Sequence, residues 1–405
     1  MKILQINTTA NTGSTGRIAE DLGRCIIGQG GKSYIAYGRT KQKSASSLIK
    51  IGNNSDIQFH GLHSLLFDMH GFGSASATKK FVQHLEENTP DIIHLHNLHG
   101  YYLNIRVLFN YLERLNIPVV WTLHDCWPFT GHCSYFDFVG CDRWITGCYA
   151  CPNRKGYPKS LILDRSASNY RTKKGLFTKL NRLVIVTPSN WLADHVRTSF
   201  IGTYPVQVIH NGVSLDRFKP VDSSQIRKKY GLGNGAVVLG VASIWDKRKG
   251  YEDFIQLRSL LDANISIILV GLSQEQIRRL PEGIIGIRRT ENIEELVALY
   301  SLADVFVNPT WVDNFPTTNI EALACGTPVV TYNTGGSPEA VSDATGIVVR
   351  KGDVSELFDA VRIVIKKGKN AYKADCINRA VTMFDSKKRY QDYLDLYAAL
   401  MAGRG

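Results

Sequence analysis

The strongest constraint on the fold is a regular alternation of short β-branched runs with amphipathic, helix-like segments. In the first half of the chain, the runs KILQINT, SYIAYG, IIHLHN, PVVWTLHD and RLVIVTPS have the character of buried strands. A second series, VVLGVAS, SIILVG, DVFVNPT, TPVVTYN and GIVVR, follows VIHNGVSLDRFKP, whose Asn-Gly and final Pro favour a connection. Strand–helix alternation of this kind predicts the α/β class, with parallel, doubly wound, Rossmann-like sheets.

The restart of the pattern predicts two domains, because 405 residues are too many for one ordinary core. We expect an N-terminal domain over residues 1–210, with a cysteine-rich insertion at 126–152, and a C-terminal domain over 211–384. Residues 385–405 predict a closing helix that packs back on the N-terminal domain. Ligands of such folds bind where strand carboxyl ends and helix N-termini converge, so we expect a phosphorylated ligand in a cleft between the domains.

The charge balance restricts the partners. The chain has 48 Lys and Arg against 36 Asp and Glu, a net charge of +12, which favours nucleic acid, acidic membranes or phosphorylated small molecules. The apolar runs are too short to span a membrane, and the first strand becomes polar at Asn7, unlike a signal peptide. We therefore expect a cytoplasmic, reducing location, where clustered cysteines hold metal more often than they form disulfides.

Two carboxylates stand out in PTWVDNFPTTNIEALACGTPVV, residues 309–330. Asp313 lies in a loop after a predicted strand, and Glu321 lies eight positions later on an otherwise apolar helix. A carboxylate in such surroundings needs hydrogen-bonding partners, and a pair of ligand hydroxyls would supply them. The plainer alternative is an acidic residue favoured by a helix dipole, followed by an exposed Glu.

Two further strand ends carry residues suited to phosphate. VASIWDKRKGYEDFI places Lys249 just before Gly250, after a buried strand, although KRKG alone would fit a solvated basic turn. TTANTGSTGRIAEDL is a strand, a Gly/Ser/Thr loop and a helix, with Gly13 and Gly16 in the loop. The spacing is not G-x-G-x-x-G, and no acidic residue ends the following strand, so both features argue against a dinucleotide oxidoreductase.

Together with HD, W, TG, C and CP in this order over residues 124–152, these motifs resemble the retaining glycosyltransferases of family 4, of the colanic-acid and exopolysaccharide type. The resemblance covers essentially the whole chain and implies the GT-B fold, two Rossmann-like domains facing across a cleft. It implies a hexosyltransferase of polysaccharide biosynthesis that uses a UDP- or GDP-linked sugar and a polyprenyl-linked oligosaccharide acceptor, peripheral on the inner face of the plasma membrane. No DxD signature lies near the site, so no cofactor is expected for catalysis.

The resemblance also implies roles for single residues. In the family's E-x7-E motif the second Glu binds the donor ribose and the first contacts the donor sugar; the matching residues are Glu321 and Asp313, the latter one methylene shorter. Lys249 matches a Lys that holds the donor diphosphate, whereas Ser243 replaces an expected Arg, and Arg248 is the candidate substitute. The remaining donor-binding candidates are Gly13, Ser14, Gly16 and Arg17 in the first loop and Asn314, Phe315, Pro316 and Thr317 in the loop after Asp313.

Strand ends in the first half supply the remaining candidates. VVWTLHDCW delivers His124, and the family carries a His at this strand end, so His124 is predicted to be catalytic with Lys249 and Asp313. A structural, hydrogen-bonding His is the alternative reading. The acceptor-side candidates are His96, Asn97, Tyr101 and Trp127, for which a satisfied buried network is an equal reading.

The cysteine-rich insertion contains Cys133, Cys141, Cys148 and Cys151, spaced C-x7-C-x6-C-x2-C. One C-x2-C arm fits zinc, although the x7 spacing is looser than usual. We expect a structural zinc that is closed to substrate; unligated thiols, an iron–sulfur cluster and disulfides remain open.

Residues 170–183 predict a basic helix. Leu176, Phe177, Leu180 and Leu183 share one face, and Arg171, Lys173, Lys174, Lys179 and Arg182 lie on the others. This helix is either an ordinary surface helix or a patch for an anionic membrane. Two other functions stay open: a sugar-nucleotide epimerase of the same fold, which needs no acceptor, and a zinc-ribbon nucleic-acid binder, whose binding would depend steeply on salt. The glycosyltransferase prediction includes no nucleic-acid partner.

Overall fold

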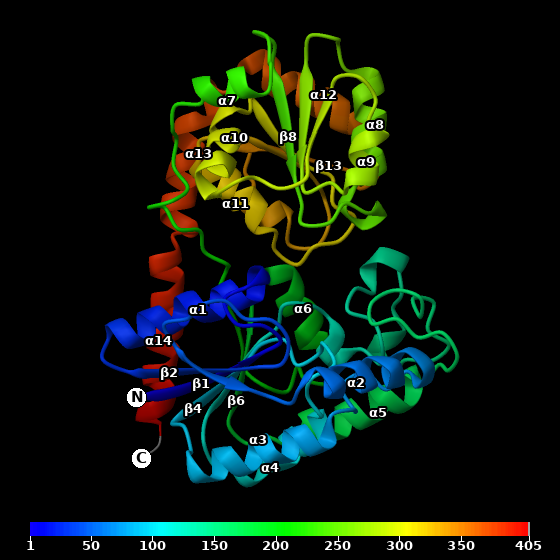
Figure 1. The fold of residues 1–405 in the computed structure, drawn as a ribbon, viewed down its shortest axis with the longest axis vertical. Helices are drawn as coiled ribbons and strands as arrows, with labels where there is room; N and C mark the ends of the chain where they lie inside the picture. Colours follow the sequence, from blue (N-terminus) through cyan, green and yellow to red (C-terminus); the bar gives the residue numbers. More distant parts are fainter. Residues whose placement is uncertain (404–405) are drawn as a thin grey trace. The chain divides into compact units, whose positions relative to one another are not determined.

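The computed structural model describes residues 1–403 and divides into two compact units. Unit 1 comprises Met1–Ile209 and the chain from Tyr390 on, and unit 2 comprises His210–Arg389 (Figure 1). Each unit is a parallel α/β domain, which confirms the fold class predicted from the strand–helix alternation. Within residues 1–403, no helix combines the length and the apolar character needed to cross a bilayer.

The sheet of unit 1 has seven strands in the order β3-β2-β1-β4-β5-β6-β7, and all neighbouring pairs are parallel. The strands are β1 (Lys2–Asn7), β2 (Lys32–Tyr37), β3 (Ser47–Lys50), β4 (Ile92–Leu95), β5 (Val119–Thr122), β6 (Leu183–Thr187) and β7 (Val206–Val208). The sequence analysis missed β3 and β7. Both are edge strands with no fully buried side chain, so they lack the apolar signal of a central strand.

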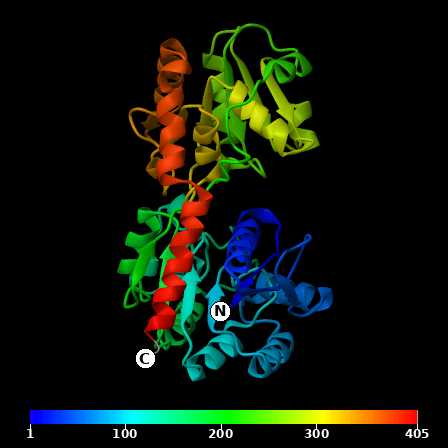
Figure 2. The same ribbon diagram turned by 90° about the vertical axis from the view of Figure 1, so that its left-hand side faces the viewer.

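Helices cover both faces of this sheet (Figures 1 and 2). On β1, Ile3 packs with α1 (Gly13–Gly28) and α14 (Ser386–Ala402), whereas Leu4 belongs to the core on the opposite face. That opposite core is covered by α3 (Ala75–Glu87), α4 (Ile105–Arg114), α5 (Ser166–Phe177) and α6 (Asn190–Thr198). Helix α2 (Asn54–Phe67) adds only partly buried contacts to this core.

The sheet of unit 2 has six strands in the order β10-β9-β8-β11-β12-β13, again with parallel pairs. Its strands are β8 (Val237–Val241), β9 (Ser266–Val270), β10 (Ile284–Ile287), β11 (Val305–Asn308), β12 (Val329–Tyr332) and β13 (Gly346–Val349). The helices are α7 (Ser224–Lys229), α8 (Tyr251–Leu260), α9 (Gln274–Arg278), α10 (Ile293–Leu302), α11 (Thr317–Ala324), α12 (Val354–Lys367) and α13 (Asn370–Met383). Helices α8 and α12 pack together, and α10, α11 and α13 form a separate group (Figure 1).

The closing helix α14 is tied to unit 1 by buried polar contacts as well as apolar ones. The Tyr397 hydroxyl lies 2.6 Å from His94 Nδ1, and the Tyr393 hydroxyl lies 3.1 Å from Thr122 Oγ1. His94 Nε2 lies 2.7 Å from the same Thr122 oxygen, so the four side chains form one network between α14 and strands β4 and β5. Such a network is costly to break, because each buried polar group would lose its partner.

The predicted basic helix over residues 170–183 differs from the observed one. Helix α5 ends at Phe177, and Leu183 opens strand β6. Lys173, expected on a polar face, is fully buried, while Leu176 and Phe177 pack in the core as expected. The sequence could not show that Lys173 is buried, because the carbonyl oxygens that accept hydrogen bonds from its ammonium group lie in a loop more than forty positions away.

Candidate functional site

Two of the predicted catalytic residues meet at one edge of the unit 2 sheet. Strands β8 and β11 are parallel neighbours, so the loops that follow them leave from the same edge. Lys249 lies in a 3₁₀ turn after β8 (η4, Lys247–Lys249), and Asp313 lies in the loop after β11. The Lys249 Nζ forms an ion pair with Asp313 Oδ2, and both side chains are about one-fifth exposed, 22% and 20%. A ligand at this edge can therefore reach both groups.

The turn that carries Lys249 is docked firmly on the loop after β11. Asp246 caps the turn, since its Oδ1 accepts a 3.0 Å hydrogen bond from the Lys249 backbone N–H. Gly250 adopts a φ of +77°, and a Cβ at this position would lie 2.2 Å from the Pro309 carbonyl oxygen. The Trp311 N–H donates to the Arg248 carbonyl at 2.8 Å. Only glycine allows this close approach, which fixes the height of Lys249 above the sheet.

The loop from Asn314 to Thr317 leads directly into helix α11. Both polar atoms of the Asn314 side chain are buried and have no hydrogen-bond partner within residues 1–403. Unsatisfied buried amides are rare in folded proteins, so this side chain is a candidate for direct contact with a ligand. Phe315 instead stacks on His210, with ring centroids 4.9 Å apart, and is buried. Its ring anchors the loop, and only its backbone can face a ligand.

Glu321 lies one helical turn into α11, on the same face as Thr317. The Tyr300 hydroxyl donates a 2.8 Å hydrogen bond to Glu321 Oε2, which fixes the orientation of the carboxylate. Burial and the adjacent Glu321 carboxylate raise the pKa of Tyr300 well above its ordinary value, so this hydroxyl remains a donor. Pro316 immediately precedes the helix, and Thr317 opens it, so backbone N–H groups of the first turn point towards the same edge.

The predicted substitute for the family arginine remains a prediction. Ser243 is exposed, two residues beyond the end of β8. Arg248 is half-buried in the same turn as Lys249, with its Nε 3.9 Å from Asp246 Oδ2. The same turn therefore carries two basic side chains, Arg248 and Lys249, whereas Ser243 is uncharged.

In unit 1, the ends of β4 and β5 bring His96 and His124 together. His124 Nε2 lies 3.1 Å from His96 Nδ1, and the rings stack with centroids 5.4 Å apart. His96 is buried, and its Nε2 lies 3.1 Å from Gln5 Oε1. Burial lowers the pKa of His124 to about 4, so its imidazole is neutral at pH 7. The acceptor contact expected of His96 is blocked by this burial, and His96 orients His124 instead.

A pair that the sequence analysis overlooked lies beside these histidines. His99 Nε2 lies 2.6 Å from Asp125 Oδ2, and His99 Nδ1 lies 3.1 Å from the Tyr157 hydroxyl. Burial would raise the pKa of Asp125, but the contact with His99 outweighs it and the net pKa is lowered. His99 is the third histidine of HLHNLHG, and that clustering was the available signal. Asn97 and Tyr101, predicted on the acceptor side, are both partly exposed in this same segment.

Trp127 is not available to stack on a sugar, because only 1% of it is exposed. The buried Lys173 ammonium lies 3.5 Å from the Trp127 ring centroid and donates to the backbone oxygens of Trp127 at 2.8 Å and Thr130 at 3.1 Å. Burial lowers the pKa of Lys173 to about 7. The predicted acceptor contact is therefore replaced by a cation–π contact inside the domain.

The first glycine-rich loop is short and tightly packed. Helix α1 begins at Gly13, and Ser14 and Arg17 are exposed in its first turns. A Cβ on Gly16 would lie 2.7 Å from Thr9 Oγ1 and 3.2 Å from the Thr9 carbonyl oxygen. Gly16 therefore lets the helix start pack against the preceding loop, while the exposed residues remain available to a ligand.

The four predicted metal-binding cysteines gather around one small pocket, lined also by His132, Trp144 and Tyr149. All four are free thiols. A hydrogen bond between Cys133 and Cys151 raises the pKa of Cys133 and lowers that of Cys151 to about 7. Within residues 1–403, however, no group of three or more His, Cys, Asp or Glu side chains has an arrangement that could hold a metal ion. The thiols are gathered but do not converge on one point.

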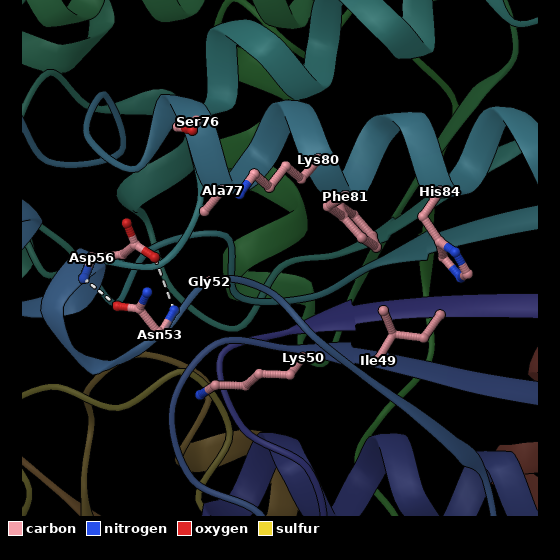
Figure 3. A pocket seen from close by; sticks show the side chains of 10 residues that line it. All are labelled: Ile49, Lys50, Gly52, Asn53, Asp56, Ser76, Ala77, Lys80, Phe81 and His84. Atoms are coloured by element: carbon pink, nitrogen blue, oxygen red, sulfur yellow. Dashed lines mark hydrogen bonds between the residues drawn. The ribbon is translucent and has the colours of Figure 1, made fainter.

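A separate cavity of about 380 Å³ lies in unit 1 between β3, the start of α2 and α3 (Figure 3). Basic side chains outnumber acidic ones in its lining: Lys50, Lys80 and His84 against Asp56. Asp56 is occupied in capping α2 with Asn53. None of the site residues predicted from the sequence lines this cavity.

The buried histidines of unit 1 predict an acid-sensitive fold. Burial lowers the pKa of His60 to about 4 and that of His94 to about 3, both below the unfolded value near 6.5. The unfolded chain therefore binds more protons between these values, and stability should fall as the pH drops below about 6.5, by up to about 1.4 kcal/mol per pH unit for each such group. Urea unfolding at pH 7 and pH 5 measures this slope. His94→Asn should reduce it, whereas substitution of the exposed His63 should leave it unchanged; equal slopes in all three proteins would contradict the assignment.

The chain is similar to known glycosyltransferases in sequence and in fold. The chain matches the family Glycosyltransferase Family 4 over residues 15–217 and Glycosyl transferases group 1 over residues 235–367. It is 25% identical to the putative colanic acid biosynthesis glycosyl transferase WcaC of Escherichia coli K12, over 99% of this chain and 100% of that protein. Among solved structures, sucrose-phosphate synthase from Thermosynechococcus elongatus superposes with a TM-score of 0.73 at 19% identity, covering 99% of both chains. Anabaena Alr3699/HepE, solved with UDP, superposes with a TM-score of 0.68 at 18% identity, covering 98% of this chain and all of that one. The chain belongs to glycosyltransferase family 4 and has the GT-B fold.

Proposed function

We propose that this glycosyltransferase moves a hexosyl unit, with retention of anomeric configuration, from a nucleoside-diphosphate sugar to an oligosaccharide acceptor. The observation that supports the proposal most directly is the Lys249–Asp313 ion pair in the loops that follow β8 and β11, with Glu321 eight positions after Asp313 on helix α11. The three residues come from segments up to 72 positions apart and provide a cation for diphosphate and carboxylates for hydroxyls.

In this reaction the bond between the anomeric carbon and the diphosphate oxygen breaks, and the leaving diphosphate takes the electron pair. The Lys249 ammonium and the backbone N–H groups at the start of α11 stabilise that growing negative charge. The acceptor oxygen bonds to the anomeric carbon on the face the diphosphate leaves, and its proton passes to a phosphate oxygen. Neutral His124 is partly exposed beyond the end of β5, so it is available to hydrogen-bond a sugar hydroxyl. The protein's contribution is thus positioned charge and dipoles rather than a protein base.

The donor is proposed to carry UDP or GDP. Alr3699/HepE, whose fold this chain shares, has been solved in complex with UDP-glucose. The testing experiment is a thermal-shift screen followed by a donor-hydrolysis assay across UDP-, GDP- and ADP-sugars. Stabilisation and slow hydrolysis with one donor class are expected. No response to any nucleotide sugar, or isomerisation of the donor without acceptor, overturns the proposal.

The acceptor is proposed to be a polyprenyl-diphosphate-linked oligosaccharide, used at the inner face of a membrane. The full-length similarity to a colanic acid glycosyl transferase supports an acceptor of this kind. The basic cavity beside α3 is compatible with an anionic group of such an acceptor, because its single carboxylate is already occupied. We expect transfer to fail with free monosaccharide acceptors.

We also propose that Cys133, Cys141, Cys148 and Cys151 hold a structural zinc ion. Four thiols around one pocket, with partial thiolate character at Cys151, are the soft donor set that zinc prefers. Convergence of the four thiols on one ion would close the site, and the ion would brace a segment that has only short 3₁₀ turns of its own. This role is structural, and no step of the transfer is assigned to the metal.

Cys151→Ser is accordingly expected to lower the zinc content and the Tm together, the latter by at least about 4 °C. Metal analysis of protein purified under reducing conditions, combined with calorimetry, measures both quantities. Cys25→Ser is the matched control, since Cys25 lies on α1 away from the four. Wild-type protein without stoichiometric zinc would rule out the metal.

A further inference from the structure

Helix α2 is built with its polar side inward. The residues that it buries are His60 and Ser64, whereas Phe59 is 73% exposed, Leu62 52% and Phe67 39%. A surface helix normally buries its apolar stripe and exposes its polar one. In α2 the two fully buried side chains are polar, and Ile57, Leu65 and Leu66 are only partly buried. The exposed apolar side chains therefore need an explanation that packing within the chain does not give.

The inward face of α2 is fixed by specific polar contacts. His60 Nε2 accepts hydrogen bonds from the N–H groups of Gly71 and Gly73, both at 3.2 Å, and its Nδ1 lies 3.0 Å from Ser74 Oγ. At the other end, Asp68 accepts a 2.8 Å hydrogen bond from the Arg165 N–H and pairs with buried His132. Because these partners determine the rotation of the helix, Phe59 and Leu62 cannot turn inward without breaking them, and Phe67 lies at the end of the helix.

A second exposed apolar segment lies directly beside α2. The Leu161 N–H donates to the Leu65 carbonyl at 2.8 Å, and the Leu163 N–H donates to the Leu66 carbonyl at 3.2 Å. Residues 161–163 thus cap the last turn of α2, and Leu161, Ile162 and Leu163 are 48%, 60% and 42% exposed. We call these three residues together with Phe59, Leu62 and Phe67 the α2 patch.

The chain next to the α2 patch is strongly basic. Residues 154–182 contain nine Lys and Arg and one acidic residue, Asp164, whose carboxylate accepts hydrogen bonds from Ser166 and the Cys151 N–H. Lys155, Lys159 and Arg165, within six positions of Leu161–Leu163, are exposed. Apolar side chains that protrude beside basic ones match the boundary of an anionic bilayer, where the former enter the acyl region and the latter meet headgroups.

We propose that the α2 patch is the surface through which this protein binds an anionic lipid membrane. The sequence offers the helix over residues 170–183 as a membrane-binding surface, but the apolar side chains of that segment are buried in the core. The α2 patch takes over this role. The inference rests on the proposed function in one respect, since a lipid-linked acceptor would bring the protein to a membrane. Its physical basis is the exposed apolar side chains of α2 and the basic residues beside them. A protein partner would need the same apolar face but not the anionic lipid.

The test is co-sedimentation of the full chain with vesicles of phosphatidylcholine, with and without phosphatidylglycerol. Wild-type protein should bind the anionic vesicles, and Phe59→Ser/Leu62→Ser/Ile162→Ser should bind at least about 10-fold more weakly. Ile363→Ser is the matched control, because Ile363 is 55% exposed on α12, outside the patch. Lys155→Glu/Lys159→Glu should reduce the preference for phosphatidylglycerol, whereas Arg171→Glu/Lys174→Glu on α5 should reduce it less.

Donor hydrolysis and thermal unfolding, measured without lipid, separate this inference from the proposed function. The triple variant should hydrolyse the donor and unfold as the wild type does. If the wild type itself hydrolyses no donor, the proposed function is wrong, but the membrane-binding role of the α2 patch is not affected. Equal vesicle binding by wild type and the triple variant overturns the inference. Wild-type self-association that the triple variant abolishes, without vesicle binding by either protein, overturns it in favour of a protein interface.

Discussion

Lys249→Ala is expected to lower kcat by about 10²-fold or more, because it removes the cation proposed to stabilise the charge of the leaving diphosphate. The ammonium is preorganised: Asp246 caps its turn, Gly250 docks that turn on Pro309, and Asp313 holds Nζ by an ion pair. Charge fixed in advance costs no reorganisation during bond breaking, so its loss should fall mainly on kcat and less on KM. Steady-state transfer kinetics with the donor identified by the screen measure both.

Lys247→Ala is the matched control. Lys247 opens the same 3₁₀ turn but is exposed, and no ion pair joins it to Asp313, so wild-type kinetics are expected. Lys249→Arg should restore part of the rate, because it keeps the charge but changes the geometry of the donors. If Lys249→Ala and Lys247→Ala lose activity equally, general basicity of the turn matters and the specific role of Lys249 is wrong.

The architecture was predictable because the central strands of a parallel sheet are buried on both faces and appear as apolar runs. Ten strands were found in this way, whereas β3, β7 and β10 were missed. All three lie at sheet edges, where fewer side chains are buried and the pattern weakens. The meeting of Lys249 with Asp313, 64 positions apart, followed from the rule that carboxyl ends of parallel strands share one edge.

The details of unit 1 were less predictable. His96, Trp127 and Lys173 are residue types that often reach ligands or solvent, yet the structure buries all three. Each is buried by partners from distant segments: Gln5 for His96, and Lys173 and Trp127 for one another. The periodicity of one segment contains no information about such partners. The inverted polarity of α2 is a case of the same kind, since the groups that hold His60 inside are backbone N–H groups with no sequence signature.

Glu321→Ala is expected to weaken binding of the nucleotide by about 10²-fold or more, since hydrogen bonds to a charged group contribute roughly 1.5–3 kcal/mol each and a ribose offers two hydroxyls. Tyr300 orients the carboxylate by its 2.8 Å hydrogen bond to Oε2. The ribose does not react, so its contacts are the same in the ground and transition states. The loss should therefore appear mainly in Kd and KM, with a smaller change in kcat, the reverse of the pattern for Lys249→Ala. Titration calorimetry with the free nucleoside diphosphate measures Kd without any acceptor.

Tyr300→Phe distinguishes orientation of this carboxylate from its charge. The variant keeps the Glu321 charge and removes the Tyr300 hydroxyl that donates to Oε2, so binding should weaken by about 10-fold or less. Tyr300 is fully buried, and loss of its hydroxyl removes a hydrogen bond to Glu321 Oε2. This loss can lower the stability of the variant, so thermal unfolding must be measured together with the titration. Nucleotide affinity that is unchanged in Glu321→Ala, in protein that unfolds as wild type does, would remove Glu321 from the donor site. In that case the cation and the carboxylates at this edge of the sheet do not act on a single ligand.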